Sequence, residues 1–257
     1  MKAMSTSFNT RLAAVLVCAM LGACASKPER GYGAAAQAER EAALERTSRE
    51  GALPDSPGMY LALIDKMQSE GMYYASLAHI DAYEKRYGRS PDSTLRRADA
   101  LRKTEQTDAS RTAYDSLLST PLAARGHRGL GLLAGEAGDF DEAARQFAQA
   151  SDLDPTDAPI LSDLGYALLR MGNIDAARVP LMKASELARN NPKIQKNLVL
   201  YLLASAQGEA AREIVAQQQF SAETQQAIQK NLKLVLDAAK IKGDMSRAAV
   251  ASMARAM

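Results

Sequence analysis

A spacing of 34 residues in the middle of the chain constrains its fold more than any other feature. Small and large apolar residues recur at this interval. Leu130-Gly131, Gly138, Ala143, Phe147 and Ala150 reappear as Leu164-Gly165, Gly172, Ala177, Leu181 and Ala184. A period of this length predicts a helix–turn–helix unit that cannot bury its apolar face alone and therefore stacks on its neighbours. The sequence thus predicts an all-α solenoid.

The repeating unit resembles the tetratricopeptide repeat (TPR), whose small and large apolar positions match those above. The resemblance implies an extended concave face that binds other proteins. It makes a binding scaffold the first hypothesis and an enzyme the second.

We assign five repeats to residues 57–218. The third repeat is the most regular, and the second is degenerate because residues 105–108, its turn, lack the glycine of its neighbours. The repeats span 57–90, 91–123, 124–157, 158–191 and 192–218.

A capping helix is predicted after the last repeat, over about 222–240, with Ser221 as its N-cap. Its buried face should carry Ile228, Leu232, Val235, Leu236 and Ala239. Terminal repeats need such a cap with a polar outer face. Within the C-terminal region 219–257, residues 243–257 fit either a short helix or a frayed end.

The N-terminus predicts a bacterial lipoprotein signal over residues 1–23. Lys2 and Arg11 precede an uncharged apolar run from residue 12 to 24, which is short for a transmembrane helix but fits a secretory signal. The run ends in Leu21-Gly-Ala-Cys24, which resembles a lipobox. The alternative is an ordinary secreted protein in which Cys24 is incidental. Acylation of Cys24 is favoured because a lone cysteine in a secreted protein needs an explanation.

Residues 24–56 are interpreted as the lipidated N-terminus, a polar tether and a lead-in segment. By resemblance to bacterial lipoproteins, Ala25, which is not aspartate, implies sorting to the outer membrane. Several acyl chains would hold the protein stably on the inner leaflet, facing the periplasm. Apart from this covalent lipid on Cys24, no cofactor is expected.

Composition and motifs give little support for catalysis. The formal net charge is +2, from 32 basic and 30 acidic residues, which does not suggest binding of nucleic acid. His79 is expected on a helix surface and His127 at a packing or groove position. Residues 152–157 superficially resemble a calcium loop but lack its glycine, so they are interpreted as an inter-repeat turn and cap. The glycines of 126–135 follow no strand, so they should serve helix packing rather than phosphate binding.

A partner-binding groove is predicted from the first helices of repeats three to five, because in TPR folds these helices line the concave face. The candidates are positions that the repeat pattern leaves outside the core, and solvated faces are the alternative. They are Arg125, Arg128, Ser162, Tyr166, Arg170, Lys193, Lys196 and Asn197, with Leu132 and Leu200. Such a set suits an extended or helical peptide with acidic groups or a C-terminal carboxylate.

Two segments extend the resemblance to a narrower family. Residues 197–215 (NLVLYLLASAQGEAAREIV) and 221–232 (SAETQQAIQKNL) are similar to the C-terminal half of the TadD-like TPR lipoproteins of tight-adherence (Flp) pilus machines. The resemblance implies an outer-membrane-anchored assembly factor, pilotin-like, whose partner is the pilus secretin or another Tad/Flp assembly protein. The alternatives are a TPR lipoprotein of another envelope machine: a type IVa pilus pilotin, an outer-membrane protein assembly lipoprotein or a peptidoglycan-hydrolase adaptor. A hydrolase would need a clustered His or carboxylate site, which we predict is absent.

Overall fold

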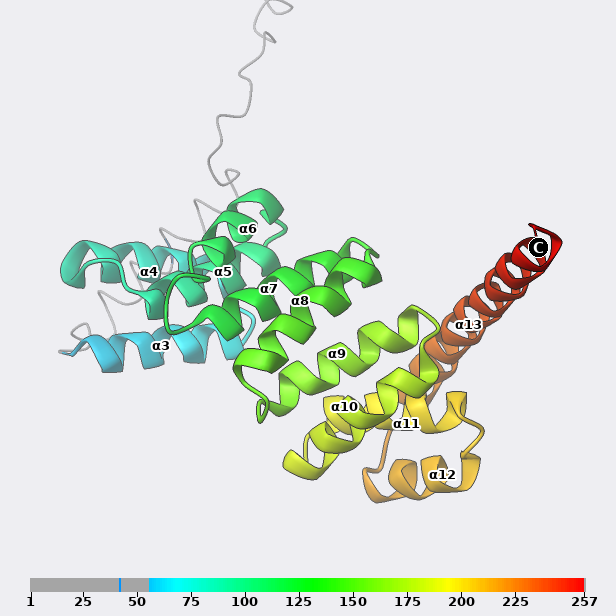
Figure 1. Cartoon of the computed structure of the whole chain (residues 1–257). Helices are drawn as coiled ribbons and strands as arrows, with labels where there is room; N and C mark the ends of the chain where they lie inside the picture. The colour runs from blue at the N-terminus through cyan, green and yellow to red at the C-terminus, as the bar shows by residue number, and fades with distance from the viewer. Residues whose placement is uncertain (1–41, 43–55, 257) are drawn as a thin grey trace, which may run out of the picture.

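In a computed structural model, residue 42 and residues 56–256 are described, with side chains as far as Asp244. Between residues 56 and 256 the chain is helical without a strand, so the predicted all-α solenoid is confirmed (Figure 1). Five helix pairs follow one another and a long helix ends the chain. The helices are α3 (Pro57–Ser69), α4 (Tyr73–Tyr87), α5 (Pro91–Lys103), α6 (Thr107–Asp115), α7 (Ala123–Glu136), α8 (Phe140–Leu153), α9 (Ala158–Arg170), α10 (Ile174–Leu187), α11 (Pro192–Ala204), α12 (Gly208–Gln217) and α13 (Ala222–Ala256).

The first helix of four repeats begins at a polar cap followed by a proline in its first turn. The side chains of Ser56, Ser90, Asp157 and Asn191 each accept a hydrogen bond from a backbone N–H of the first turn. Proline tolerates this position because its missing N–H would have no partner within the helix. The interpretation of residues 152–157 as a turn and cap is therefore confirmed, since Asp157 caps α9.

In the third and fourth repeats, the two helices cross at a glycine. A Cβ added to Gly131 would lie 2.7 Å from the ring of Phe147, and one added to Gly165 would lie 2.3 Å from Cγ of Leu181. Both glycines lie on the first helix, and both large side chains lie sixteen positions later on the second. The 34-residue period thus records a helix crossing that leaves no room for a side chain.

A glycine also allows close packing between the second and third repeats. Gly129 faces the ring of Tyr114, which is fully buried against Leu130 and Leu133. The Tyr114 hydroxyl donates a 2.5 Å hydrogen bond to Asp99, and burial raises the pKa of this tyrosine. The glycines of α7 therefore serve close packing, as the sequence predicts.

The turn inside each repeat contains one residue in the left-handed region. It is glycine in three repeats, but Glu105 (φ 60°) and Ala206 (φ 61°) occupy it in the second and fifth. The positions are 71, 105, 138, 172 and 206. A side chain there costs roughly 1–2 kcal/mol, because Cβ crowds the following carbonyl.

The C-terminal helix is longer than predicted. α13 runs to Ala256 instead of ending near residue 240, and it neither frays nor restarts within 243–256. No proline interrupts this stretch, and its alanines, arginines and methionines favour a helix. Ser221 caps α13 as predicted, accepting a hydrogen bond from the N–H of Thr224 at 3.2 Å. Leu236, however, was wrongly placed on the buried face, since it is 45% exposed.

α13 packs against α11 and α9 (Figure 1). Its buried residues Ile228 and Val235 join the apolar cluster of the last two repeats. Over residues 56–256, no helix combines the length and apolar character that crossing a bilayer would require.

We expect opposite effects from exchanging glycine and alanine at two of these turns. Gly138→Ala should lower the free energy of unfolding by about 1–2 kcal/mol, from backbone strain alone, because nothing lies within 4 Å of the new Cβ. Ala206→Gly should raise it by about 1 kcal/mol. Urea unfolding curves check both, and equal signs for the two variants would contradict the assignment of these turns.

Candidate binding groove on the concave face

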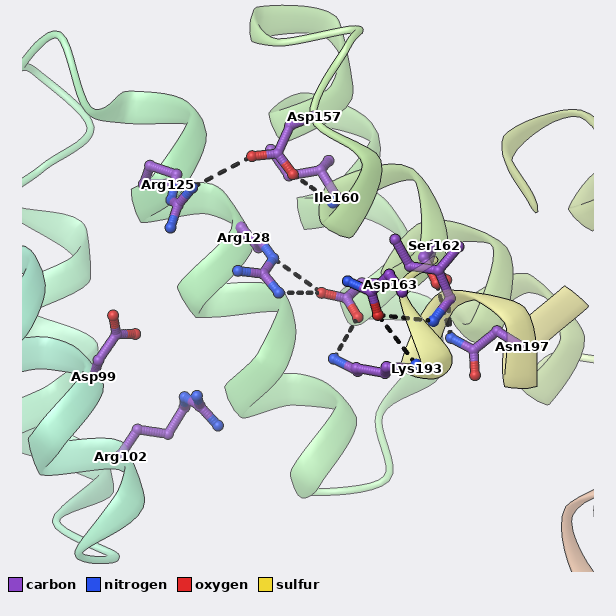
Figure 2. Close-up of polar contacts among 12 residues, drawn as sticks. Asp99, Arg102, Arg125, Arg128, Asp157, Ile160, Ser162, Asp163, Lys193 and Asn197 are labelled. Atoms are coloured by element: carbon purple, nitrogen blue, oxygen red, sulfur yellow. Dashed lines mark hydrogen bonds and ion pairs between the residues drawn. The ribbon is translucent and has the colours of Figure 1, made fainter. Parts of the chain in front are cut away.

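The first helices of successive repeats are joined by ion pairs. Arg96 of α5 pairs with Asp65 of α3 at 2.8 Å, and Arg102 of α5 pairs with Glu136 of α7 at 2.5 Å. We call this series the ion-pair ladder, and its last rung is a triad centred on Asp163. Asp163 of α9, which is 6% exposed, lies 2.9 Å from Arg128 of α7 and 3.1 Å from Lys193 of α11 (Figure 2).

The ladder engages three of the predicted groove cations. Besides Arg128 and Lys193, Arg125 pairs with Asp157 at 3.3 Å. Each of these side chains therefore already has a carboxylate partner within the chain, and Arg128 and Lys193 share theirs. Arg170 and Lys196 differ, because neither forms an ion pair among residues 56–244.

Ser162 and Asn197 also hold repeats together, which corrects the expectation that they lie outside the core. They are 1% and 6% exposed. The Asn197 amide donates to the Ser162 hydroxyl at 2.9 Å, which links α11 to α9 (Figure 2). A buried amide needs such a partner, and sequence periodicity alone could not show that these two side chains supply it to each other.

The other predicted residues meet at a pocket of about 280 Å³ on the first helices of repeats three to five. Tyr166, Arg170, Lys193 and Lys196 line it, as do the side chains of Leu132 and Leu200. Arg125, Arg128 and Ser162 do not. The remaining lining residues are Gly131, Gly135, Glu136, Phe140, Ala143, Phe147, Asp163, Ala167, Asn197, Ile228 and Asn231.

An aromatic cluster orients Arg170 in this pocket. Its guanidinium carbon lies 4.1 Å from the ring centroid of Phe140, and its NH1 donates to the Tyr166 hydroxyl at 3.0 Å. The Phe140 and Tyr166 rings meet edge to face, with centroids 6.3 Å apart. The cation is thus stacked on an aromatic face, an arrangement that attracts it electrostatically.

The C-terminal helix supplies one wall of the pocket. Ile228 and Asn231 line it, and the Tyr166 hydroxyl donates to Asn231 Oδ1 at 2.9 Å. Further along α13, Ala238 and Ala239 pass so close to the α9–α10 turn that a Cβ on Gly172 would lie 2.6 Å from the Ala239 nitrogen.

Phe140 and Asn231 are pocket residues that the repeat pattern does not predict. The predicted groove residues all lie on first helices, whereas Phe140 begins α8 and Asn231 lies on α13. One signal was present: Asn231 is a polar residue directly beside Ile228 and Leu232 on the predicted apolar face.

The histidines lie far apart and in different settings. His79 is fully buried rather than on the surface, and its Nδ1 lies 3.2 Å from the Tyr60 hydroxyl. Burial lowers its pKa. His127 is half-buried and contacts Gln146 Oε1 at 2.8 Å, a packing position as predicted. Among the described residues, no three His, Cys, Asp or Glu side chains gather as a metal site would require.

Comparison with known proteins agrees with this architecture. Two tetratricopeptide-repeat family models match residues 95–158 and 136–199. The TPR repeat-containing protein PA4299 of Pseudomonas aeruginosa is 31% identical over 159 residues, which are 60% of this chain and 56% of that protein. The match therefore spans little more than half of the relative's length.

A solved structure shows the same fold. The thermophilic TPR protein TTC0263 of Thermus thermophilus has a TM-score of 0.56 and 19% identity, over 70% of this chain and 99% of that one. MamA of Desulfovibrio magneticus RS-1 is more distant, with a TM-score of 0.48 and 16% identity, over 68% and 98%. Residues 95–199 of this chain are thus similar to tetratricopeptide repeats, a class of repeats that typically presents binding surfaces for other proteins.

The triad around Asp163 should be a stability element. Asp163→Ala removes the shared acceptor of Arg128 and Lys193, and we expect it to lower the free energy of unfolding by about 2 kcal/mol. Glu209→Ala breaks an exposed ion pair with Arg212 and should cost less than about 0.5 kcal/mol. Chemical denaturation of both variants measures the difference, and equal losses would show that the triad contributes nothing beyond a surface pair.

Proposed function

We propose that this chain is an outer-membrane TPR lipoprotein, anchored through acylated Cys24, that acts as a pilotin-like assembly factor for a Flp/Tad pilus secretin. It acts by binding, without catalysis, nucleic acid or a small-molecule substrate. Cys24 and the rest of the anchor region lie outside the described residues, so the anchor is proposed from the sequence alone.

The proposed binding role rests on the pocket of repeats three to five. This pocket combines an apolar lining with two cations, Arg170 and Lys196, that have no carboxylate partner within residues 56–244. Concave, largely apolar pockets with a few polar groups are the usual form of binding sites. A pocket with this character on the concave face of a solenoid favours a protein segment as its ligand.

The position of the pocket supports the narrower proposal. The segments 197–215 and 221–232, on which the likeness to TadD-like lipoproteins depends, form most of α11, α12 and the start of α13. They contribute Asn197, Leu200, Ile228 and Asn231 to the pocket. Part of the stretch that carries the resemblance therefore lies at the proposed binding site.

Tethering explains how a binding scaffold could promote assembly. Acyl chains would confine the groove to the inner leaflet of the outer membrane, where a secretin must insert. Confinement raises the effective concentration of groove and partner without any new contact, as in linked binding sites. Loss of the anchor should therefore reduce assembly even when the groove is intact.

The test is deletion of the gene in its host, followed by membrane fractionation and detection of the secretin multimer. We expect the multimer to disappear or to stay in the inner membrane. Complementation with the intact gene should restore it, and complementation with Cys24→Ala should fail although the protein is produced.

Normal secretin assembly in the deletion strain would contradict the proposal. A defect in outer-membrane protein assembly, in type IVa pili or in cell-wall hydrolysis would instead assign the groove to one of those machines. Full rescue by Cys24→Ala would reject the tether but leave the groove as a binding site.

A further inference from the structure

The charge of the pocket is unbalanced. Two carboxylates, Glu136 and Asp163, line it, and both are already paired through the ion-pair ladder. Asp163 is shared by two cations, so one positive charge remains there. Among the lining residues, three cations (Arg170, Lys193 and Lys196) therefore face two carboxylates.

The lining beneath these cations is apolar. Leu132, Phe140, Phe147, Leu200 and Ile228 all contribute to it. The volume of about 280 Å³ lies at the lower end of the roughly 300–1,000 Å³ that is typical of ligand pockets. Such a space suits one or two side chains of a protein segment rather than a larger ligand.

We infer that a partner protein inserts a large apolar side chain into this pocket and places an adjacent carboxylate against Arg170 and Lys196, with the chain's own helix α13 as a required wall. The inference rests on the proposed function in that it names the chemistry of the segment bound there. The two unpaired cations favour a carboxylate on the partner, and the apolar lining favours a large apolar side chain next to it.

Arg170 is prepared for this role by its surroundings. Phe140 and the Tyr166 hydroxyl already restrict its orientation, so it loses little conformational freedom when a carboxylate binds. Charge-assisted hydrogen bonds from a guanidinium are also stronger than neutral ones. Lys196 adds a second positive charge to the same pocket.

The role of α13 follows from where it touches the solenoid. Asn231 accepts from Tyr166, which in turn accepts from Arg170, so the wall is part of the hydrogen-bond chain that positions the cation. Because Gly172 has no side chain, Ala239 of α13 can pack closely against the α9–α10 turn. The cap is therefore a component of the site as well as the end of the solenoid.

A peptide selection tests the chemistry of the ligand. The full-length chain, purified in dodecyl maltoside, is used to select from a phage library of random dodecapeptides. We expect enriched sequences to carry Asp or Glu beside Leu, Ile, Met or Phe. The best synthetic peptide should bind Lys196→Glu at least tenfold more weakly than the unchanged protein.

Lys183→Glu is the matched control, because Lys183 is exposed on α10, outside the pocket. It makes the same charge change and should alter the affinity less than twofold. The absence of enriched peptides, enrichment of sequences without acidic residues, or equal losses in the two variants would overturn the inference.

A second pair of variants tests the wall. Gly172→Ala and Gly138→Ala impose the same backbone strain at equivalent turns (φ 74° and 83°), but only the first would collide with α13. We expect Gly172→Ala to weaken peptide binding at least fivefold and Gly138→Ala to leave it unchanged. Asn231→Ala should also weaken it, without backbone strain. Unchanged affinity in both Gly172→Ala and Asn231→Ala would remove α13 from the site.

These outcomes are separate from those of the proposed function. Selective binding of acidic–apolar peptides alongside normal secretin assembly in the deletion strain would keep the pocket and reject the secretin as its partner. A secretin defect without peptide selectivity would keep the secretin as the partner and reject the proposed chemistry of the pocket.

Discussion

The close crossing of the two helices in repeats three and four shapes the part of the solenoid that holds the pocket. Gly131 against Phe147 and Gly165 against Leu181 bring the helix backbones together where any side chain would collide. Because these two repeats cross in the same way, their first helices, α7 and α9, lie on the same side of the solenoid. That alignment places charged residues of successive repeats within reach of one another, and it creates both the ion-pair ladder and the pocket.

The ion-pair ladder then determines which charges on the first helices remain without a carboxylate partner. Arg125, Arg128 and Lys193 resemble ligand-binding cations in the sequence, but Arg125 is paired with Asp157, and Arg128 and Lys193 share Asp163. A charge engaged in holding repeats together contributes little to recognition, since a ligand would have to displace its partner. Arg170 and Lys196 are left, at the place where the C-terminal helix narrows the groove.

The fold was predictable because its signal is local and repeated. Helical periodicity, glycines at crossings and turns, and capping residues all act over short distances along the chain, and they predicted the solenoid and the N-cap at Ser221. The site was only partly predictable. Tyr166, Arg170 and Lys196 were identified from their helix positions, but the burial of Ser162 and Asn197 depends on contacts 35 residues apart.

The features that the sequence did not predict also depend on contacts between distant residues. Asn231 accepts a hydrogen bond from Tyr166, which is 65 residues away in the sequence. The position of α13 depends on its close contact with Gly172, and helical periodicity does not predict such a contact. His79 was misplaced because its environment comes from Tyr60 on another helix. Contacts between repeats, rather than patterns within them, determine which residues are free to bind.

If the pocket of repeats three to five holds the partner in the cell, a photo-crosslinking amino acid at position 196 should react with that partner. We expect a crosslink from position 196 to the secretin, detected with an antibody to that protein, and none from the same amino acid at position 183 on α10. Equal crosslinking from both positions, or a secretin crosslink from position 183 alone, would contradict this expectation.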